Sequence, residues 1–130
     1  MTIEPDEATN EISRRVIGAA IEVHRILGPG YLESVYEEAL AIELGARGIP
    51  FKRQHGFTIT YKGTVVGSGR LDFLVAGSLV VELKTAERVL EIHRAQVISY
   101  LKATRTPLGL ILNFKAPVLR EGIERVVYSV

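Results

Sequence analysis

Two short apolar segments near the middle of the chain, residues 71–75 and 79–84, carry acidic residues inside them. The first reads Leu-Asp-Phe-Leu-Val and the second Leu-Val-Val-Glu-Leu-Lys, with Ala-Gly-Ser at 76–78 between them. Apolar runs of this length around a glycine-containing turn predict the two strands of a hairpin. Because aspartate is disfavoured in strands, Asp72 needs a reason to lie there.

The length of the turn sets the register of this hairpin. If Val75 faces Leu79 across a three-residue loop, counting outward places Asp72 opposite Glu82. Like charges directly opposite one another destabilise a sheet, and apolar surroundings increase the cost, so we expect a cation between the two carboxylates. A two-residue loop would separate the two acids and remove this argument.

Mg²⁺ is the natural candidate, because it binds one or two carboxylates together with waters and phosphate oxygens. The backbone carbonyl of Leu83 is a further candidate ligand between the two acids. Lys84 shares a strand face with Glu82, so it would reach a phosphate or a metal-bound water. The alternative is an ordinary polar strand face with Asp72 as a salt-bridge partner, and these residues alone leave both interpretations open.

Hydrophobic spacing predicts the remaining elements of a single domain, with residues 1–10 as a loose tail and 11–130 as the folded part. The elements form a mixed α/β (α+β) arrangement, a central mixed sheet flanked by helices. We expect two helices, 11–27 and 32–44, then strands at 57–61, 65 onward, 70–75 and 79–85, a helix at 87–104, and strands at 108–114 and 125–130.

Composition excludes several classes of protein. A hydrophobic fraction of 47% and a charged fraction of 24% indicate a globular chain. The absence of cysteine excludes disulfides, thiolate metal sites and cysteine nucleophiles. The acidic N-terminus lacks the pattern of a signal peptide, and no apolar run is long enough to span a bilayer, so we expect a cytoplasmic protein with no membrane partner. The formal charge of +1 conceals two opposite halves: residues 1–50 carry four basic and nine acidic residues, and residues 51–130 carry twelve and six.

Two further patterns accompany Asp72 and the Glu82-Leu83-Lys84 run. Gly30, Glu33 and Tyr36 form a Gly-x-x-Glu-x-x-Tyr pattern at the start of the second helix, and Gln96 and Tyr100 lie four residues apart on the third. Taken together and in this order, the patterns resemble the GxxExxY family, a branch of the PD-(D/E)XK, or restriction-endonuclease-like, superfamily. Leu71 stands where the superfamily name has proline.

The resemblance implies an α-β-β-β-α-β core and Mg²⁺- or Mn²⁺-dependent hydrolysis of nucleic-acid phosphodiesters. By it, Asp72 and Glu82 bind the metal with Glu33 as an additional acid, and Lys84 is the catalytic lysine that positions the attacking water or offsets developing negative charge. Gln96 and Tyr100 would border the site and position the substrate. Glu33 has a structural alternative, because an acid in the first turn of a helix favours the positive end of its dipole.

The partner implied by the resemblance is nucleic acid, with DNA favoured over RNA, and a homodimer is a further expectation. The alternative function is a catalytically silent module on the same fold that binds nucleic acid, interacts with a protein or regulates one. Retention of Asp72, Glu82 and Lys84 together favours the nuclease, because a binding module does not need a lysine two residues after a metal-binding acid. We expect Tyr36 and Tyr31 to lie in the core, and His24 and His93 to be hydrogen-bonded rather than metal-bound.

Overall fold

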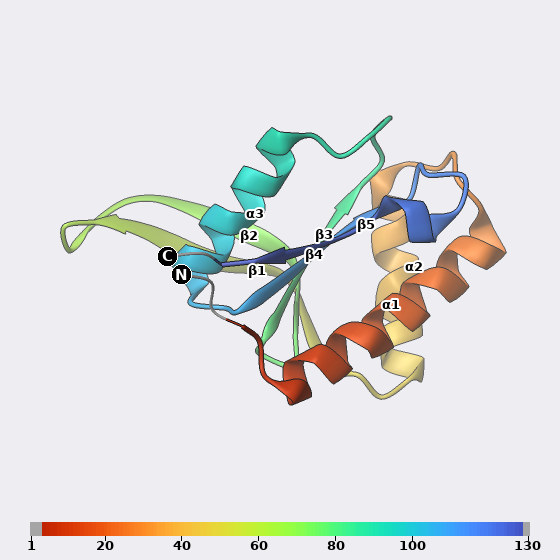
Figure 1. Ribbon diagram of the computed structural model, residues 1–130, viewed down its shortest axis with the longest axis horizontal. Coiled ribbons are helices and arrows are strands. Elements are labelled where there is room, and N and C mark those ends of the chain that lie inside the picture. The colour runs from red at the N-terminus through yellow and green to blue at the C-terminus, as the bar shows by residue number, and fades with distance from the viewer. Residues whose placement is uncertain (1–3, 129–130) are drawn as a thin grey trace.

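The computed structural model describes residues 4–128, which form a five-stranded sheet with helices on both faces (Figure 1). The mixed α/β architecture predicted from the sequence is confirmed. In chain order the elements are α1 (Glu7–Leu27), α2 (Glu33–Ala46), β1 (Phe51–Tyr61), β2 (Thr64–Val75), β3 (Leu79–Lys84), α3 (Glu91–Thr104), β4 (Leu108–Asn113), the 3₁₀ helix η1 (Leu119–Gly122) and β5 (Ile123–Val127).

The strands lie in the sheet in chain order, β1-β2-β3-β4-β5. All neighbouring strands are antiparallel except β3 and β4, which run parallel. A parallel pair needs a crossover connection, and α3 supplies it. This crossover places α3 on one face of the sheet, while α1 and α2 cover the other.

Each face of the sheet has its own apolar core. On the α1–α2 side, Tyr36 and Phe114 stack with their ring centroids 4.6 Å apart and are fully buried together with Phe73. On the α3 side, Val97 and Leu101 pack against buried strand residues. Because β3 and β4 lie between these two layers, nearly every residue of both strands is buried.

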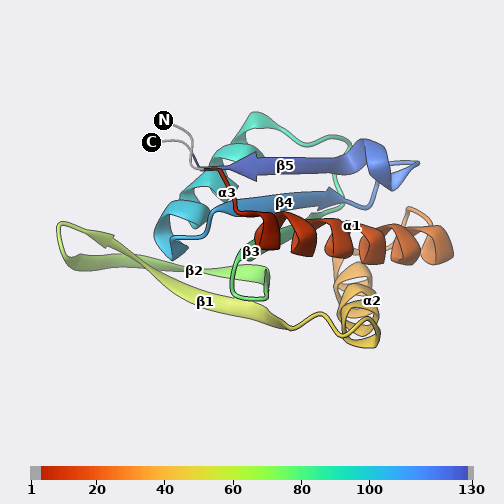
Figure 2. The same cartoon turned by 60° about the horizontal axis from the view of Figure 1, so that its bottom comes forward.

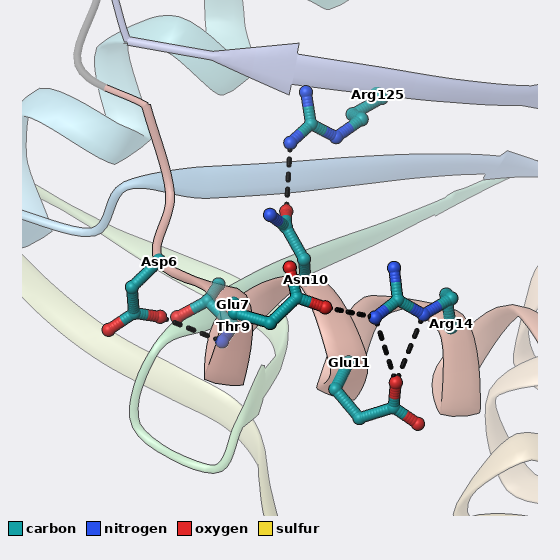
Figure 3. Close-up of polar contacts among 7 residues, drawn as sticks. All are labelled: Asp6, Glu7, Thr9, Asn10, Glu11, Arg14 and Arg125. Carbon is teal, nitrogen blue, oxygen red and sulfur yellow. Dashed lines mark hydrogen bonds and ion pairs between the residues drawn. The ribbon is translucent and has the colours of Figure 1, made fainter.

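The first helix begins at Glu7, so residues 7–10 of the expected tail are helical, and residues 1–3 lie outside the described part. Asp6 is the N-cap, since its Oδ1 accepts a hydrogen bond from the Thr9 N–H at 2.8 Å (Figure 3). Arg125 of β5 donates to Asn10 Oδ1 at 2.9 Å and ties this first turn to the sheet edge.

Several boundaries differ from those that the sequence predicts. Strand β1 begins six residues earlier than expected, at Phe51, and the two strands expected at 65 onward and 70–75 form one continuous β2. Helix α3 begins at Glu91 rather than at residue 87. The expected last strand, 125–130, lies at 123–127, and its residues 129–130 fall outside the described part. Tyr31, expected in the core, is exposed.

The β1–β2 hairpin extends past the other strands on the side where α3 ends (Figures 1 and 2). Its turn consists of Lys62 and Gly63, both with positive φ, as a two-residue type I′ connection requires. The register shifts between Ile59 and Thr60, which marks a β-bulge in the exposed part of β1.

Candidate active site

The β2–β3 hairpin has the register that the three-residue turn predicts. Val75 pairs with Leu79 and Phe73 with Val81, so the next position outward places Asp72 against Glu82. Both Ala76 and Gly77 in the turn have positive φ. The backbone ladder between the two strands ends at this point, and the two acidic side chains continue the pairing.

Each carboxylate accepts a hydrogen bond from the backbone of the opposite strand. The Asp72 N–H donates to Glu82 Oε2 at 2.7 Å, and the Leu83 N–H donates to Asp72 Oδ2 at 2.8 Å. These two bonds satisfy backbone groups that the ended ladder leaves free. They also hold the two carboxylates beside each other where the strands separate.

The environment of the pair disfavours two negative charges. Glu82 is only 5% exposed, and its burial raises the pKa to about 8, with the charge of Asp72 acting in the same direction. Burial also raises the pKa of Asp72, although the Leu83 N–H bond opposes this shift. A divalent cation between the carboxylates would offset their repulsion, and a donor set of carboxylate oxygens fits a hard ion such as Mg²⁺ or Mn²⁺.

Glu33 lies in the first turn of α2, and the Tyr36 side chain holds the loop that leads into this turn. The buried Tyr36 hydroxyl donates to the Gly28 carbonyl at 2.5 Å and accepts from the Tyr31 N–H at 3.2 Å. It therefore fixes the loop in which Gly28 and Gly30 adopt positive φ. The core position expected for Tyr36 is confirmed.

Glu33 itself is largely accessible to solvent, yet the neighbouring acid pair affects the pKa of its carboxyl group. Partial desolvation raises the pKa of Glu33, the charge of Asp72 raises it further, and the charge of Lys84 lowers it. Within residues 4–128, no group of three or more acidic or histidine side chains is placed so that it could hold a metal ion. Glu33 therefore stands beside the Asp72–Glu82 pair rather than completing a three-carboxylate cluster.

Lys84 is close enough to influence all three acids, since its charge lowers the pKa of Glu33, Asp72 and Glu82. Two contacts with β4 fix the end of its strand. The Phe114 N–H donates to the Lys84 carbonyl at 2.9 Å. The buried Asn113 side chain bonds to both backbone groups of Ala86, at 3.1 and 2.8 Å, and so holds the chain that follows.

Gln54 on β1 is a site residue that sequence reasoning missed. It lies across from Asp72, between the pairs Arg53–Phe73 and His55–Leu71, and its φ is 47°. Its Nε2 donates to Glu37 Oε1 at 2.7 Å, and a hydrogen bond from Gln54 also lowers the pKa of Asp72. No sequence signal marked it, because a glutamine before the predicted strand is unremarkable.

Of Gln96 and Tyr100, the two site residues expected on α3, the structure brings only Tyr100 close to the acid pair. Tyr100 packs edge-on against Phe57, with ring centroids 5.1 Å apart, and burial together with the charges of Glu82 and Asp72 raises its pKa. Gln96 is exposed and makes no side-chain hydrogen bond within residues 4–128. Its predicted role near the substrate stays a prediction.

Neither histidine singled out from the sequence lies at this site. His24 Nε2 bonds to the Ala116 carbonyl at 2.9 Å, and His93 Nδ1 accepts from the Leu90 N–H at 3.0 Å. Both are therefore hydrogen-bonded histidines, as expected. Among the described residues, no helix has the length and apolar character that crossing a membrane requires.

The arrangement of Asp72 against Glu82, with Lys84 following on the same strand, can be compared with known families. Residues 10–126 match the model of the PD-(D/E)XK nuclease superfamily. The chain belongs to this superfamily. PD-(D/E)XK membership supports a nuclease-like function in general, and members of the superfamily generally use divalent metals. No curated protein matches the chain, and placement in the GxxExxY branch stays a prediction.

Proposed function

We propose that the chain is a Mg²⁺- or Mn²⁺-dependent nuclease that hydrolyses nucleic-acid phosphodiesters at the β2–β3 junction. One observation carries the proposal: two carboxylates, Asp72 and Glu82, are held side by side in a partly buried position. Holding two such charges together without a cation is unfavourable, so the arrangement has the character of a metal site. A bound divalent cation activates water and stabilises charge on the phosphoryl oxygens.

Asp72 and Glu82 would bind the cation through the carboxylate oxygens not used in the backbone bonds. The Leu83 carbonyl is a third ligand in this proposal, and the backbone geometry supports it. In a strand, the N–H and C=O of one residue point toward the same neighbouring strand. Because the Leu83 N–H donates to Asp72, the Leu83 carbonyl also faces the acid pair.

The remaining residues act around the scissile phosphodiester. Lys84 carries a positive charge beside the acids and would offset negative charge that develops on the phosphoryl oxygens. Glu33, whose pKa is raised by partial desolvation and by the charge of Asp72, would accept a proton from the attacking water. Tyr100 and Gln96 lie one helical turn apart on α3, where they would contact the substrate backbone.

Cleavage assays test the proposal. Purified protein is incubated with single- and double-stranded DNA and RNA, with Mg²⁺, Mn²⁺ or EDTA, beside the variants Asp72→Asn and Lys84→Met. We expect metal-dependent cleavage that falls at least 100-fold in both variants, because each removes a charge that the reaction needs. The DNA and RNA arms decide the predicted preference for DNA.

Glu87→Gln is the matched control, because Glu87 is an exposed carboxylate whose partner is Lys115, away from the acid pair. Its activity should equal that of the parent chain. Cleavage that persists in EDTA, or that is unchanged in Asp72→Asn, would refute the proposed site.

A second candidate is a catalytically silent module that binds nucleic acid or a protein, and the two cross-strand bonds favour it. They give Asp72 and Glu82 a structural role even without turnover. If this candidate is right, the parent chain cleaves no substrate with either metal, and Asp72→Asn leaves partner binding unchanged. The homodimer and the cytoplasmic location also stay predictions.

A further inference from the structure

A groove lies between the projecting β1–β2 hairpin and the C-terminal half of α3. It has a volume of about 410 Å³ and is lined by Ile59 and Thr60 of β1 and by Ser99, Lys102 and Arg105 of α3, among others. Tyr100, whose pKa responds to Asp72 and Glu82, lies on the same stretch of helix.

The segments that form this groove are basic and contain no acid. The stretches that line it, residues 58–60 and 99–105, hold two basic residues, Lys102 and Arg105, and no aspartate or glutamate. Within the described range 4–128, neither Lys102 nor Arg105 forms an ion pair, in contrast to Arg53, Arg94 and Lys115. Both cations are exposed and line the groove, Lys102 from the last turn of α3 and Arg105 from the residue that follows the helix.

Arg105 occupies a backbone position where arginine is unfavourable. It ends α3 with φ 55° and ψ 43°, the left-handed conformation that glycine or asparagine usually adopts after a helix. Lys62 is similar, because it stands at the first position of the hairpin turn with φ 49°. A charged side chain held in such a conformation at a cost in stability points to a use for its charge.

We propose that this groove binds the sugar-phosphate backbone of a single nucleic-acid strand, with Lys102 and Arg105 contacting consecutive phosphates. The inference rests on the proposed function, because the bound strand is the one delivered to Asp72 and Glu82. A positively charged groove that follows the sugar-phosphate backbone is one feature of proteins that bind single strands. The groove lies between one strand and one helix, so it admits a single backbone more readily than a rigid duplex.

Binding is measured without catalysis, by fluorescence anisotropy of labelled single-stranded DNA, single-stranded RNA and a matched duplex in EDTA over a range of salt concentrations. In the double variant Lys102→Ala/Arg105→Gly, single-strand affinity should fall at least tenfold. The slope of log K against log salt should become shallower by about 1.4, at 0.7 for each lost phosphate contact. Arg120→Ala, which removes an exposed cation on η1, is the control and should bind as the parent does.

Arg105→Gly also separates binding from folding. Because glycine relieves the left-handed strain, the melting temperature should rise by roughly 3–5 °C while affinity falls. Unchanged affinity and salt slope in the double variant, or tighter binding of the duplex than of the single strand, would overturn the groove proposal.

Asp72→Asn distinguishes this proposal from the proposed function. It should cleave no single strand, and in EDTA it should bind single strands at least as tightly as the parent chain, because it removes a negative charge beside the bound phosphates. If Asp72→Asn still cleaves while the groove variant loses binding, the active-site proposal fails and the groove proposal holds. If the groove variant binds and cleaves normally while Asp72→Asn is inactive, the groove proposal fails and the active-site proposal holds.

Discussion

Glu82 is the residue whose environment departs furthest from that of an ordinary glutamate. Its strand is buried on both faces, and the neighbouring Asp72 adds a second negative charge. Both effects favour the protonated form when no cation is present. The pair therefore lowers the stability of the metal-free protein at neutral and basic pH, which is a common cost of a preorganised charged site.

This environment predicts a pH-dependent stability. With the pKa of Glu82 at about 8 in the folded chain and near its ordinary 4.5 when unfolded, folded Glu82 keeps a proton that the unfolded chain releases. In EDTA, the free energy of unfolding should therefore fall as pH rises from 4.5 to 8, by up to about 1.4 kcal/mol per pH unit. Denaturant unfolding at several pH values measures this slope.

Glu82→Gln removes this titrating group, so its unfolding free energy should fall less steeply over the same range and exceed that of the parent chain at pH 8. Glu87→Gln is again the control, because the Lys115 contact lowers rather than raises the pKa of Glu87. A parent chain whose stability is flat from pH 5 to 8 would contradict the assignment.

The sequence predicts some site residues and not others. Strand periodicity and a three-residue turn were enough to place Asp72 opposite Glu82, because register fixes which side chains face each other. They could not find Gln54, which reaches the site through an irregular backbone conformation on a strand whose first half carries no clear apolar alternation.

At the scale of elements, the helices and strands form where apolar periodicity places them, and their ends depend on local contacts. Gly28 ends α1 as expected, with φ 70° and its N–H bonded to the His24 carbonyl. The start of α1 depends instead on Asp6 as a cap, which a tail assigned from polarity alone overlooks. The sequence predicts β1 too short because the pairing partners of its first residues lie in β2, between 14 and 24 residues away along the chain.

The cap on α1 gives a direct test of this corrected boundary. Asp6→Ala removes the acceptor for the Thr9 N–H, so the melting temperature should fall by a few degrees. Glu4→Ala, a neighbouring exposed acid before the helix, should leave it unchanged. Equal melting temperatures for both variants would show that the first turn contributes nothing, as expected of a loose tail.

At the scale of the whole molecule, the acidic and basic halves of the sequence lie on different sides of the sheet. The acid-rich N-terminal helices cover one face of the sheet, and the basic hairpin and α3 lie toward the other (Figure 1). The acid pair lies where β2 and β3 separate between these layers. A net charge of +1 therefore does not argue against a nucleic-acid substrate, because the relevant charge is local.

The architecture and the facing acids follow from the sequence, whereas the groove beside α3 does not. Its walls come from β1 and α3, about 40 residues apart, and its shape depends on a β-bulge and on the left-handed Arg105. Such features arise from tertiary contacts, so the hydrophobic periodicity of the sequence does not predict them.

The proposed function requires Asp72 and Glu82 to hold a divalent cation at the β2–β3 junction. Anomalous diffraction from crystals soaked in Mn²⁺ tests it most directly. We predict a manganese peak between the two carboxylates, about 2.0–2.4 Å from their oxygens and from the Leu83 carbonyl, that disappears in Asp72→Asn crystals. Well-diffracting parent crystals with no peak there, or a peak that persists in Asp72→Asn, would contradict the account.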